Sequence, residues 1–243
     1  MNINFDENKT VITKIATVKS DFKEKFGVPR QSGRAPSVIS EIVFEKEYAV
    51  KEAFCGIENF SHLWVIFGFS LTKEEGFSPT VRPPRLGGNK RMGVFATRSP
   101  NRPNKIGLSS GKLISVDFSN GVKLKVSGLD LVDGTPVYDI KPYIKYSDCH
   151  SDAISGFADE FQRYSLKGLG VCLNVTIPDN LKSLLPEEKA EALTECLADD
   201  PRPSYQSDPE RIYKMSFADF TIGFKVKEDE LTVISIEKLS LKT

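Results

Sequence analysis

Short segments rich in β-branched residues alternate with turns throughout the first half of the chain. Val11–Val18 is one such segment, and Lys112–Phe118 and Val122–Ser127 are two more. The last two are joined through Asn120-Gly121, a strong local signal for a β-hairpin. Several short strands at this spacing, with little helix, are typical of an antiparallel barrel. We therefore predict an antiparallel β-barrel over residues 1–148.

One segment of this half is almost continuously apolar. His62–Phe69 contains the only tryptophan, Trp64, and its composition suits a strand buried on both faces. No strand of this half is followed by the glycine pattern GxGxxG and a helix, and there is no Walker A loop. A Rossmann-type or P-loop nucleotide site is therefore not indicated.

The second half has a different composition. Pro186–Ala198 is the clearest helix, because Pro suits the first helical position and the apolar side chains recur at helical spacing. Val171–Thr176 is a possible strand, and Tyr213–Val226 with Leu231–Ile236 reads as a closing hairpin. We predict a small α+β domain over residues 149–243 that needs the barrel for part of its core. The predicted fold class is mainly β.

Charge and cysteine content set broad limits. Lys+Arg and Asp+Glu are 33 each, but residues 76–116 hold eight bases and no acid. The N-terminus is polar and acidic, unlike a signal peptide, and no apolar run is long enough for a membrane span. The four cysteines form no CxxC pair and only two histidines accompany them, so a metal site is not indicated and a cytoplasmic protein with reduced thiols is expected.

The basic residues concentrate in Pro79–Gly107. This stretch holds seven Lys/Arg, five Pro, four Gly and no acid. A run of one charge sign with a backbone shaped by Pro and Gly suits a polyanion site, although a long basic surface loop is the simpler alternative. Val94–Thr97 within it is predicted to be a short buried strand, which would place Arg98 beside the core.

Three further polar groups stand out. Pro29-Arg30-Gln31 combines a rigid backbone with planar donor groups, although a solvated turn explains most such tripeptides. Asp130 and Asp133 bracket Leu-Val, and Asp133 before Gly is also a common turn cap. His62 begins the apolar strand, where a histidine is more often structural than functional.

The sequence also resembles a known family. VRPPRLGGNKRMGVFATRSPNRPNKIG is very similar to the signature of the tRNA adenosine-37 N6-methyltransferases, called TrmO-like, with a TsaA-like barrel domain. KFGVPRQ, ENFSHLWVIF, DLVDGTPVYDIKPY and DPRPSY follow in the family's order, so the resemblance covers nearly the whole chain. Lys105 stands where the family usually has Pro, which should loosen one turn.

The resemblance implies an activity, a cofactor and a fold. Family members use S-adenosylmethionine to methylate N6 of threonylcarbamoyl-adenosine at tRNA position 37, on a single-sheet β-barrel, and form homodimers. The same activity, cofactor, barrel and assembly are expected here. The positions that match the family's cofactor contacts are Pro29, Arg30, Gln31, His62, Leu63, Arg98, Leu108, Asp130, Leu131, Val132 and Asp133.

Chemistry assigns roles to some of these residues. The carboxylate of the cofactor would pair with Arg30 or Arg98, and its ammonium with Asp130 or Asp133. The acceptor nitrogen N6 is a poor nucleophile, so removal of its proton would help. We expect a carboxylate to take that proton, with Asp133 preferred to Asp130, or else His62.

The tRNA contacts should come from cations on phosphates and from aromatic side chains that stack on splayed bases. Arg202 has an equally good alternative role as a charge partner of the neighbouring Asp199 or Asp200. The candidate tRNA contacts are Arg82, Arg85, Lys90, Arg91, Arg102, Arg202 and Tyr205.

Two other functions remain open from the sequence. A non-catalytic RNA-binding barrel would use the basic stretch alone, although acids such as those of DLVD would not help it bind a polyanion. A methyltransferase with a different acceptor would keep the cofactor site and differ in its loops.

Overall fold

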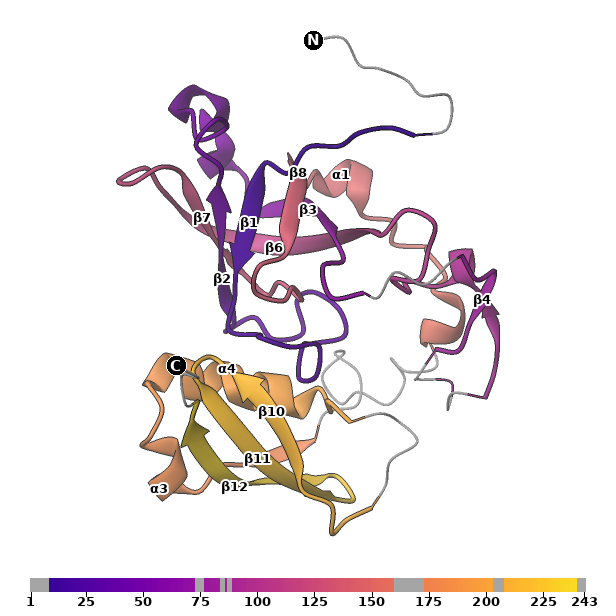
Figure 1. Ribbon diagram of the computed structural model, residues 1–243, viewed down its shortest axis with the longest axis vertical. Coiled ribbons are helices and arrows are strands. Elements are labelled where there is room, and N and C mark those ends of the chain that lie inside the picture. The colour runs from indigo at the N-terminus through magenta and orange to yellow at the C-terminus, as the bar shows by residue number, and fades with distance from the viewer. Residues whose placement is uncertain are drawn as a thin grey trace.

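The computed structural model describes residues 9–72, 77–83, 86, 89–159, 173–202 and 208–239. Six antiparallel strands close into a barrel in the order β1-β2-β7-β6-β3-β8, with β8 pairing back to β1 (Figure 1). The predicted single-sheet barrel is thereby confirmed. The barrel strands are β1 (Ala16–Lys19), β2 (Ile39–Phe44), β3 (His62–Gly68), β6 (Ile106–Asp117), β7 (Lys123–Ser127) and β8 (Pro136–Pro142).

The barrel encloses one apolar core built from alternate residues of its strands. In β3, Leu63 and Val65 are fully buried while Trp64 and Ile66 are only half-buried. The prediction that His62–Phe69 is buried on both faces was therefore wrong, because a barrel strand turns alternate side chains inward and outward. The predicted hairpin at Asn120-Gly121 does join β6 to β7, and Gly121 adopts a φ of 78°.

Residues 94–97 differ from their prediction. The expected strand over Val94–Thr97 is a 3₁₀ helix, η4 (Val94–Ala96), in which Val94 is buried but Phe95 is 73% exposed. Strand β4 (Thr80–Val81) pairs with β5 (Met92–Gly93) in a separate two-stranded ribbon. Among the described residues, further helical turns are η1 (Lys51–Phe54), η2 (Ile57–Asn59), α1 (Lys145–Asp148) and η5 (Gly156–Ala158).

The second half forms a four-stranded sheet in the order β10-β11-β12-β9, with β9 parallel to β12. The predicted strand Tyr213–Val226 is in fact two strands, because the chain turns at Ala218-Asp219. The predicted helix is present as α4 (Glu187–Ala198), with Pro186 at its N-cap. The other elements are β9 (Asn174–Thr176), α3 (Asp179–Lys182), β10 (Tyr213–Phe217), β11 (Phe220–Lys227) and β12 (Glu230–Lys238).

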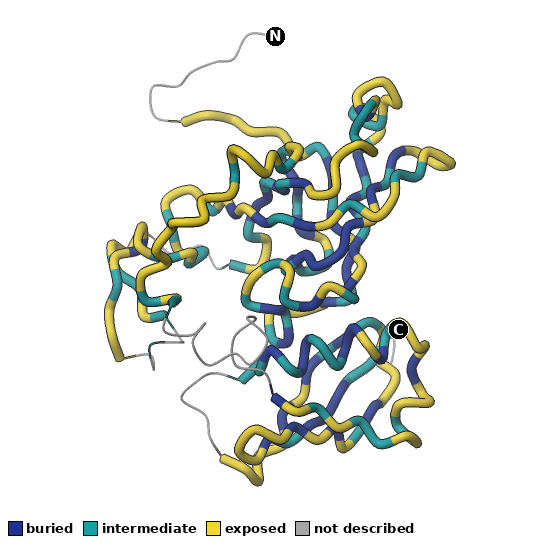
Figure 2. The backbone as a smooth tube through the Cα atoms, turned by 180° about the vertical axis from the view of Figure 1, so that it is seen from behind, coloured by how far each residue is buried: buried dark blue, intermediate teal, exposed yellow. Residues whose placement is uncertain are grey.

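The loop between β1 and β2 connects the two halves. Phe22, Ala35 and Val38 from this loop are buried in the same apolar cluster as α4 and the second sheet, whereas the barrel strands have their own cluster. Figure 1 shows α4 on the side of the sheet that faces the barrel, and Figure 2 shows buried residues in both halves. This loop also carries Pro29-Arg30-Gln31, so the second half helps to position it.

Candidate active site

A cleft of about 550 Å³ brings together residues from three distant parts of the sequence. Pro29, Arg30 and Gln31 come from the loop between β1 and β2, and Arg98 follows η4. Asp130 follows β7. Leu108, another position singled out by the sequence, also lines this cleft and is 57% exposed.

Hydrogen bonds fix the cationic side of the cleft. Arg98 Nη1 donates to Gln31 Oε1 over 2.5 Å, which joins the basic stretch to the β1–β2 loop. Arg30 Nη2 donates to the backbone carbonyl oxygens of Asp200 and Arg202 over 3.2 and 2.5 Å. Both guanidinium groups are therefore held at the cleft by neutral acceptors, and each has further N–H groups that can donate to a ligand.

The acidic side of the cleft is Asp130. Ser109 Oγ donates to Asp130 Oδ1 over 2.5 Å. Burial raises the pKa of Asp130 above its ordinary value, and the Ser109 hydrogen bond and the nearby charge of Arg98 offset only part of this effect. A half-buried carboxylate in a cleft that is also lined by Arg30, Arg98 and Arg102 suits a zwitterionic ligand that carries both an anion and a cation.

A second, apolar cavity of about 210 Å³ adjoins the cleft. The two share Phe67, Phe69 and Asp130, so they are neighbouring lobes of one site. Leu131 and Val132 line only the apolar lobe. Aromatic and aliphatic walls of this size suit a flat heteroaromatic ring.

Gly107 leaves space for the Phe67 ring, which lines both lobes. It pairs with Phe67 across β6 and β3, and a Cβ atom at position 107 would collide with the Phe67 ring. The Phe67 ring therefore lies over the backbone of its neighbour, where only glycine leaves space.

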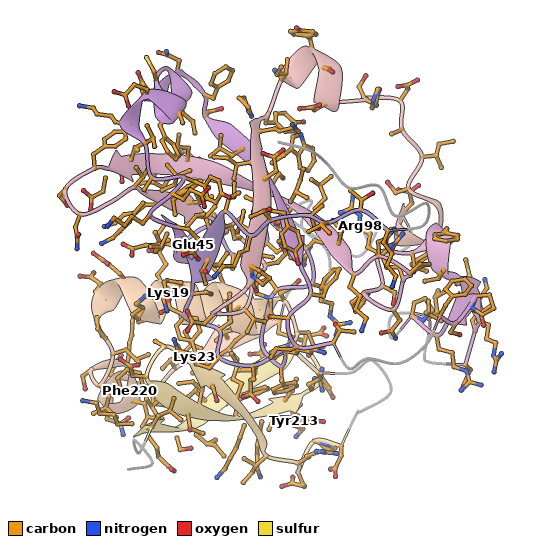
Figure 3. All side chains as sticks on the ribbon, turned by 45° about the horizontal axis from the view of Figure 1, so that its top comes forward. Lys19, Lys23, Glu45, Arg98, Tyr213 and Phe220 are labelled. Carbon is orange, nitrogen blue, oxygen red and sulfur yellow. The ribbon has the colours of Figure 1, made fainter. Side chains whose placement is uncertain are left out.

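Asp133 lies outside both lobes. Its Oδ1 accepts the Ser20 N–H over 3.0 Å, and its Oδ2 pairs with Lys23 Nζ at 3.1 Å. Burial raises its pKa, but these hydrogen bonds and the charges of Lys23 and Lys19 outweigh burial, so the pKa of Asp133 is lowered overall. Figure 3 shows Lys19 and Lys23 well separated from Arg98.

His62 and Leu63 also line neither lobe. Leu63 is fully buried in the barrel core, and His62 is exposed at the opposite end of β3 from Phe67. The His62 ring has Ser61 Oγ at 2.9 Å from Nδ1 and lies 6.2 Å from the Tyr143 ring. His62, Leu63 and Asp133 therefore do not line the cleft that contains Arg98 and Asp130.

A larger groove of about 830 Å³ lies next to the cleft and shares Arg30, Gln31, Thr97 and Arg98 with it. Arg82 lines this groove. The described residues that line it include four cations and no acid. Such a groove suits a polyanionic ligand whose reacting part enters the cleft.

The other proposed tRNA contacts lie in different settings. Lys90 and Arg91 are exposed near the β4–β5 ribbon. Arg102 lines the cleft with Arg98 and donates to the carbonyl oxygens of Thr97 and Ser99, so it also shapes the loop that carries Arg98. Arg202 forms a bidentate pair with Asp200, which agrees with the alternative role that its sequence context suggested. Arg85 and Tyr205 lie outside the described residues.

Two family models match most of the chain. The model of the tRNA-methyltransferase O N-terminal domain matches residues 17–149, and the TrmO C-terminal domain model matches residues 171–239. The chain belongs to the TrmO family.

Individual relatives of the TrmO family match most of the chain. The tRNA (adenine(37)-N6)-methyltransferase of Escherichia coli (strain K12) is 42% identical over 230 residues, which cover 92% of this chain and 96% of that protein. A crystal structure of TrmO from Pseudomonas aeruginosa superposes with a TM-score of 0.75 at 30% identity, covering 94% of this chain and 98% of that one. An S-adenosyl-L-methionine-binding protein of Archaeoglobus fulgidus is 40% identical over 139 residues, covering 57% of this chain and 93% of that protein.

Several residues of this TrmO-family site were missed by sequence reasoning. Phe67 and Phe69 were assigned to a buried strand, and Lys25 was not singled out although it lies in the same loop as Arg30. Asp199 was considered only as a possible partner of Arg202. It contacts Arg30 instead, because the fold brings these distant residues together, and no local sequence signal indicates that contact.

Two further features are relevant to function. Among the described residues, no helix is long and apolar enough to cross a membrane. The same part of the chain contains no cluster of three or more His, Cys, Asp or Glu side chains arranged to hold a metal ion.

Proposed function

We propose that this protein is an S-adenosylmethionine-dependent tRNA methyltransferase that methylates N6 of threonylcarbamoyl-adenosine at position 37. Membership of the TrmO family supports the tRNA, the N6 position and the cofactor. The observation that carries the proposal is the cleft in which Arg98, Gln31 and Arg30 face Asp130 beside an apolar lobe.

The residues of the two lobes fit the chemical groups of the cofactor. Arg98 and Arg30 are suited to its carboxylate, and Asp130 is suited to its cationic part. Phe67, Phe69, Leu131 and Val132 are suited to the adenine ring. When bound, S-adenosylmethionine supplies an electrophilic methyl group on a sulfonium centre.

Asp130 is better placed to bind the cofactor than to act as the base. It lines both lobes, but it does not line the larger groove where the nucleotide would enter. Asp133 and His62 do not line that groove either. These positions favour Asp130 over Asp133 as the carboxylate beside the reacting atoms, in the role of a charge partner.

The larger groove is the proposed acceptor site. It shares Arg30, Gln31, Thr97 and Arg98 with the cleft, so a nucleobase placed in it would lie next to a cofactor bound in the cleft. Its described lining contains no Asp, Glu or His side chain that would take a proton. The rate enhancement therefore comes chiefly from the alignment of the acceptor nitrogen with the methyl group.

The two halves of the chain have different proposed roles. We propose that residues 1–148 hold the cofactor and that residues 149–243 contact the tRNA. We further propose that the protein acts as a homodimer in the cytoplasm, as its resemblance to the family implies. The contact of Arg30 with Asp200 and Arg202 supports a second half that also shapes the cofactor cleft.

A methyl-transfer assay tests the function directly. The protein is incubated with labelled S-adenosylmethionine and two matched tRNA pools, one with threonylcarbamoyl-adenosine and one without it. Digestion and mass analysis should place label only on the hypermodified adenosine, and the Arg98→Met variant should lose most of this activity. Cofactor binding without label in either pool would indicate another acceptor. Tight tRNA binding without cofactor affinity would support a non-catalytic RNA-binding barrel.

A further inference from the structure

Lys25 occupies the junction between the apolar cofactor lobe and the acceptor groove. It lines both cavities, and the apolar lobe also contains Asp130 and Val132. With the cofactor in the two lobes and the acceptor nucleotide in the groove, a cation at this junction would lie near the acceptor nitrogen and the methyl group. The positive charge of Lys25 would therefore attract a negative charge carried near that nitrogen.

The groove contains four cations, but they are not equally available. Arg30 donates to the backbone of Asp200 and Arg202, and Arg98 donates to Gln31. Within the part of the chain that the structure describes, the Lys25 and Arg82 side chains form no hydrogen bond or ion pair. Of these two, only Lys25 also lines the cofactor lobe.

The backbone around Lys25 is held in place by its neighbours. Phe22 is fully buried, and the Phe26 ring stacks on Phe224 of the second sheet with 6.4 Å between ring centroids. Val28 N–H donates to the Lys25 carbonyl oxygen over 3.4 Å. The side chain of Lys25 is nevertheless exposed, so a fixed backbone presents a free ammonium group to the groove.

We propose that Lys25 binds the carboxylate of the N6 substituent on the acceptor adenosine and thereby selects the hypermodified base. This inference rests on the proposed function and assigns a residue to its substrate specificity. In threonylcarbamoyl-adenosine, that carboxylate is only a few bonds from N6, which matches a cation at the junction of cofactor lobe and groove. Arg82, which lines only the groove, contributes general attraction for phosphate.

The test compares two synthetic anticodon stem-loop RNAs. One carries the threonylcarbamoyl substituent with its free carboxylate, and the other carries the corresponding neutral threonine amide. The variants are Lys25→Met, Lys25→Arg and, as a control cation from the same groove, Arg82→Met. The readouts are kcat/KM for methyl transfer and the Kd for S-adenosylmethionine.

The wild type should prefer the carboxylate RNA over the amide by on the order of 10- to 100-fold in kcat/KM, as expected for a charge-assisted hydrogen bond. Lys25→Met should lose that preference while its affinity for the cofactor is unchanged, and Lys25→Arg should restore part of it. Arg82→Met should weaken activity equally on both RNAs.

Each of four results would overturn the inference, and a fifth would contradict the proposed function. Equal wild-type activity on both RNAs would show that the carboxylate is not recognised, while leaving the methyltransferase function intact. A weaker cofactor Kd in Lys25→Met would assign Lys25 to the cofactor. Retention of the full preference in Lys25→Met, or its loss in Arg82→Met, would assign recognition to another cation. Failure of the wild type to methylate either RNA would instead contradict the proposed function.

Discussion

Arg30 donates its backbone N–H to Asp199 Oδ2 over 3.1 Å, across 169 residues of sequence. Asp199 follows α4, its side chain is only 5% exposed, and it also forms an ion pair with Arg34 Nε. One buried carboxylate of the second half thus holds the loop that lines the cofactor cleft. The geometry of the cleft therefore depends on both halves of the chain.

The first prediction concerns this carboxylate. Asp199→Asn removes the charge without creating a cavity and leaves the 13% exposed Arg34 side chain without its anion. We expect a loss of about 3 kcal/mol in the free energy of unfolding, together with about tenfold weaker cofactor binding as the Arg30 loop loosens. Chemical denaturation and calorimetric titration measure the two effects.

Glu210→Gln is the matched control for Asp199→Asn. Glu210 pairs with Lys225, but its side chain is 85% exposed, so its loss should cost less than about 0.5 kcal/mol. Unchanged cofactor affinity in a destabilised Asp199→Asn protein would show that the contact is purely structural.

The second prediction concerns Asp130. Asp130→Asn should weaken S-adenosylmethionine binding by about 10- to 100-fold, because a charge partner of the cofactor becomes neutral. The pKa of Asp130 is raised. As the pH is lowered, the affinity of the wild type for the cofactor should therefore begin to fall at a pH above the ordinary pKa of an aspartate. Titrations across pH should show this fall in the wild type and not in the variant.

A different result for Asp130→Asn would reassign the residue. If kcat fell while the cofactor Kd stayed constant, Asp130 would be acting on the acceptor proton rather than on the cofactor.

The third prediction concerns Gly107. Gly107→Ala forces the Phe67 ring away from β6 and into the two lobes, which should cost about 1–3 kcal/mol of stability and weaken cofactor binding. Gly93→Ala is the control, because a Cβ there meets no atom within 4 Å. Thermal melts with and without S-adenosylmethionine compare the pair, and a Gly107→Ala protein with normal cofactor stabilisation would contradict the proposed ring site.

The fourth prediction concerns Asp133 and pH. Its pKa is lowered in the folded protein, so its charged form stabilises the fold above the pKa of the unfolded chain, and this contribution is lost as the pH falls through the folded value. Asp133→Asn should be about 1 kcal/mol less stable near neutral pH, with the difference shrinking below about pH 4. Urea denaturation from neutral to acidic pH measures this. A difference that is constant with pH would exclude the charge as its cause.

The barrel was predictable because its signals are local. Asn120-Gly121 marks the β6–β7 hairpin without reference to the rest of the fold. The strand predicted at Val94 failed because apolar composition alone does not distinguish a strand from a 3₁₀ turn, and Phe95 is exposed in the structure.

The site was only partly accessible from the sequence. Arg30, Gln31, Arg98 and Asp130 were all singled out, and the structure brings them together. Their grouping depends on contacts between distant segments, such as the pair of Arg98 with Gln31, which no local pattern specifies.

The shared apolar core has a consequence for the order in which the chain folds. Phe22, Ala35 and Val38 are synthesised early, yet they pack against α4 and β10–β12 near the other end of the chain. On the ribosome, the barrel strands can pair while this loop still lacks its partners. The cofactor cleft should therefore be among the last parts to form, and nascent chains that end before α4 should expose these side chains to chaperones.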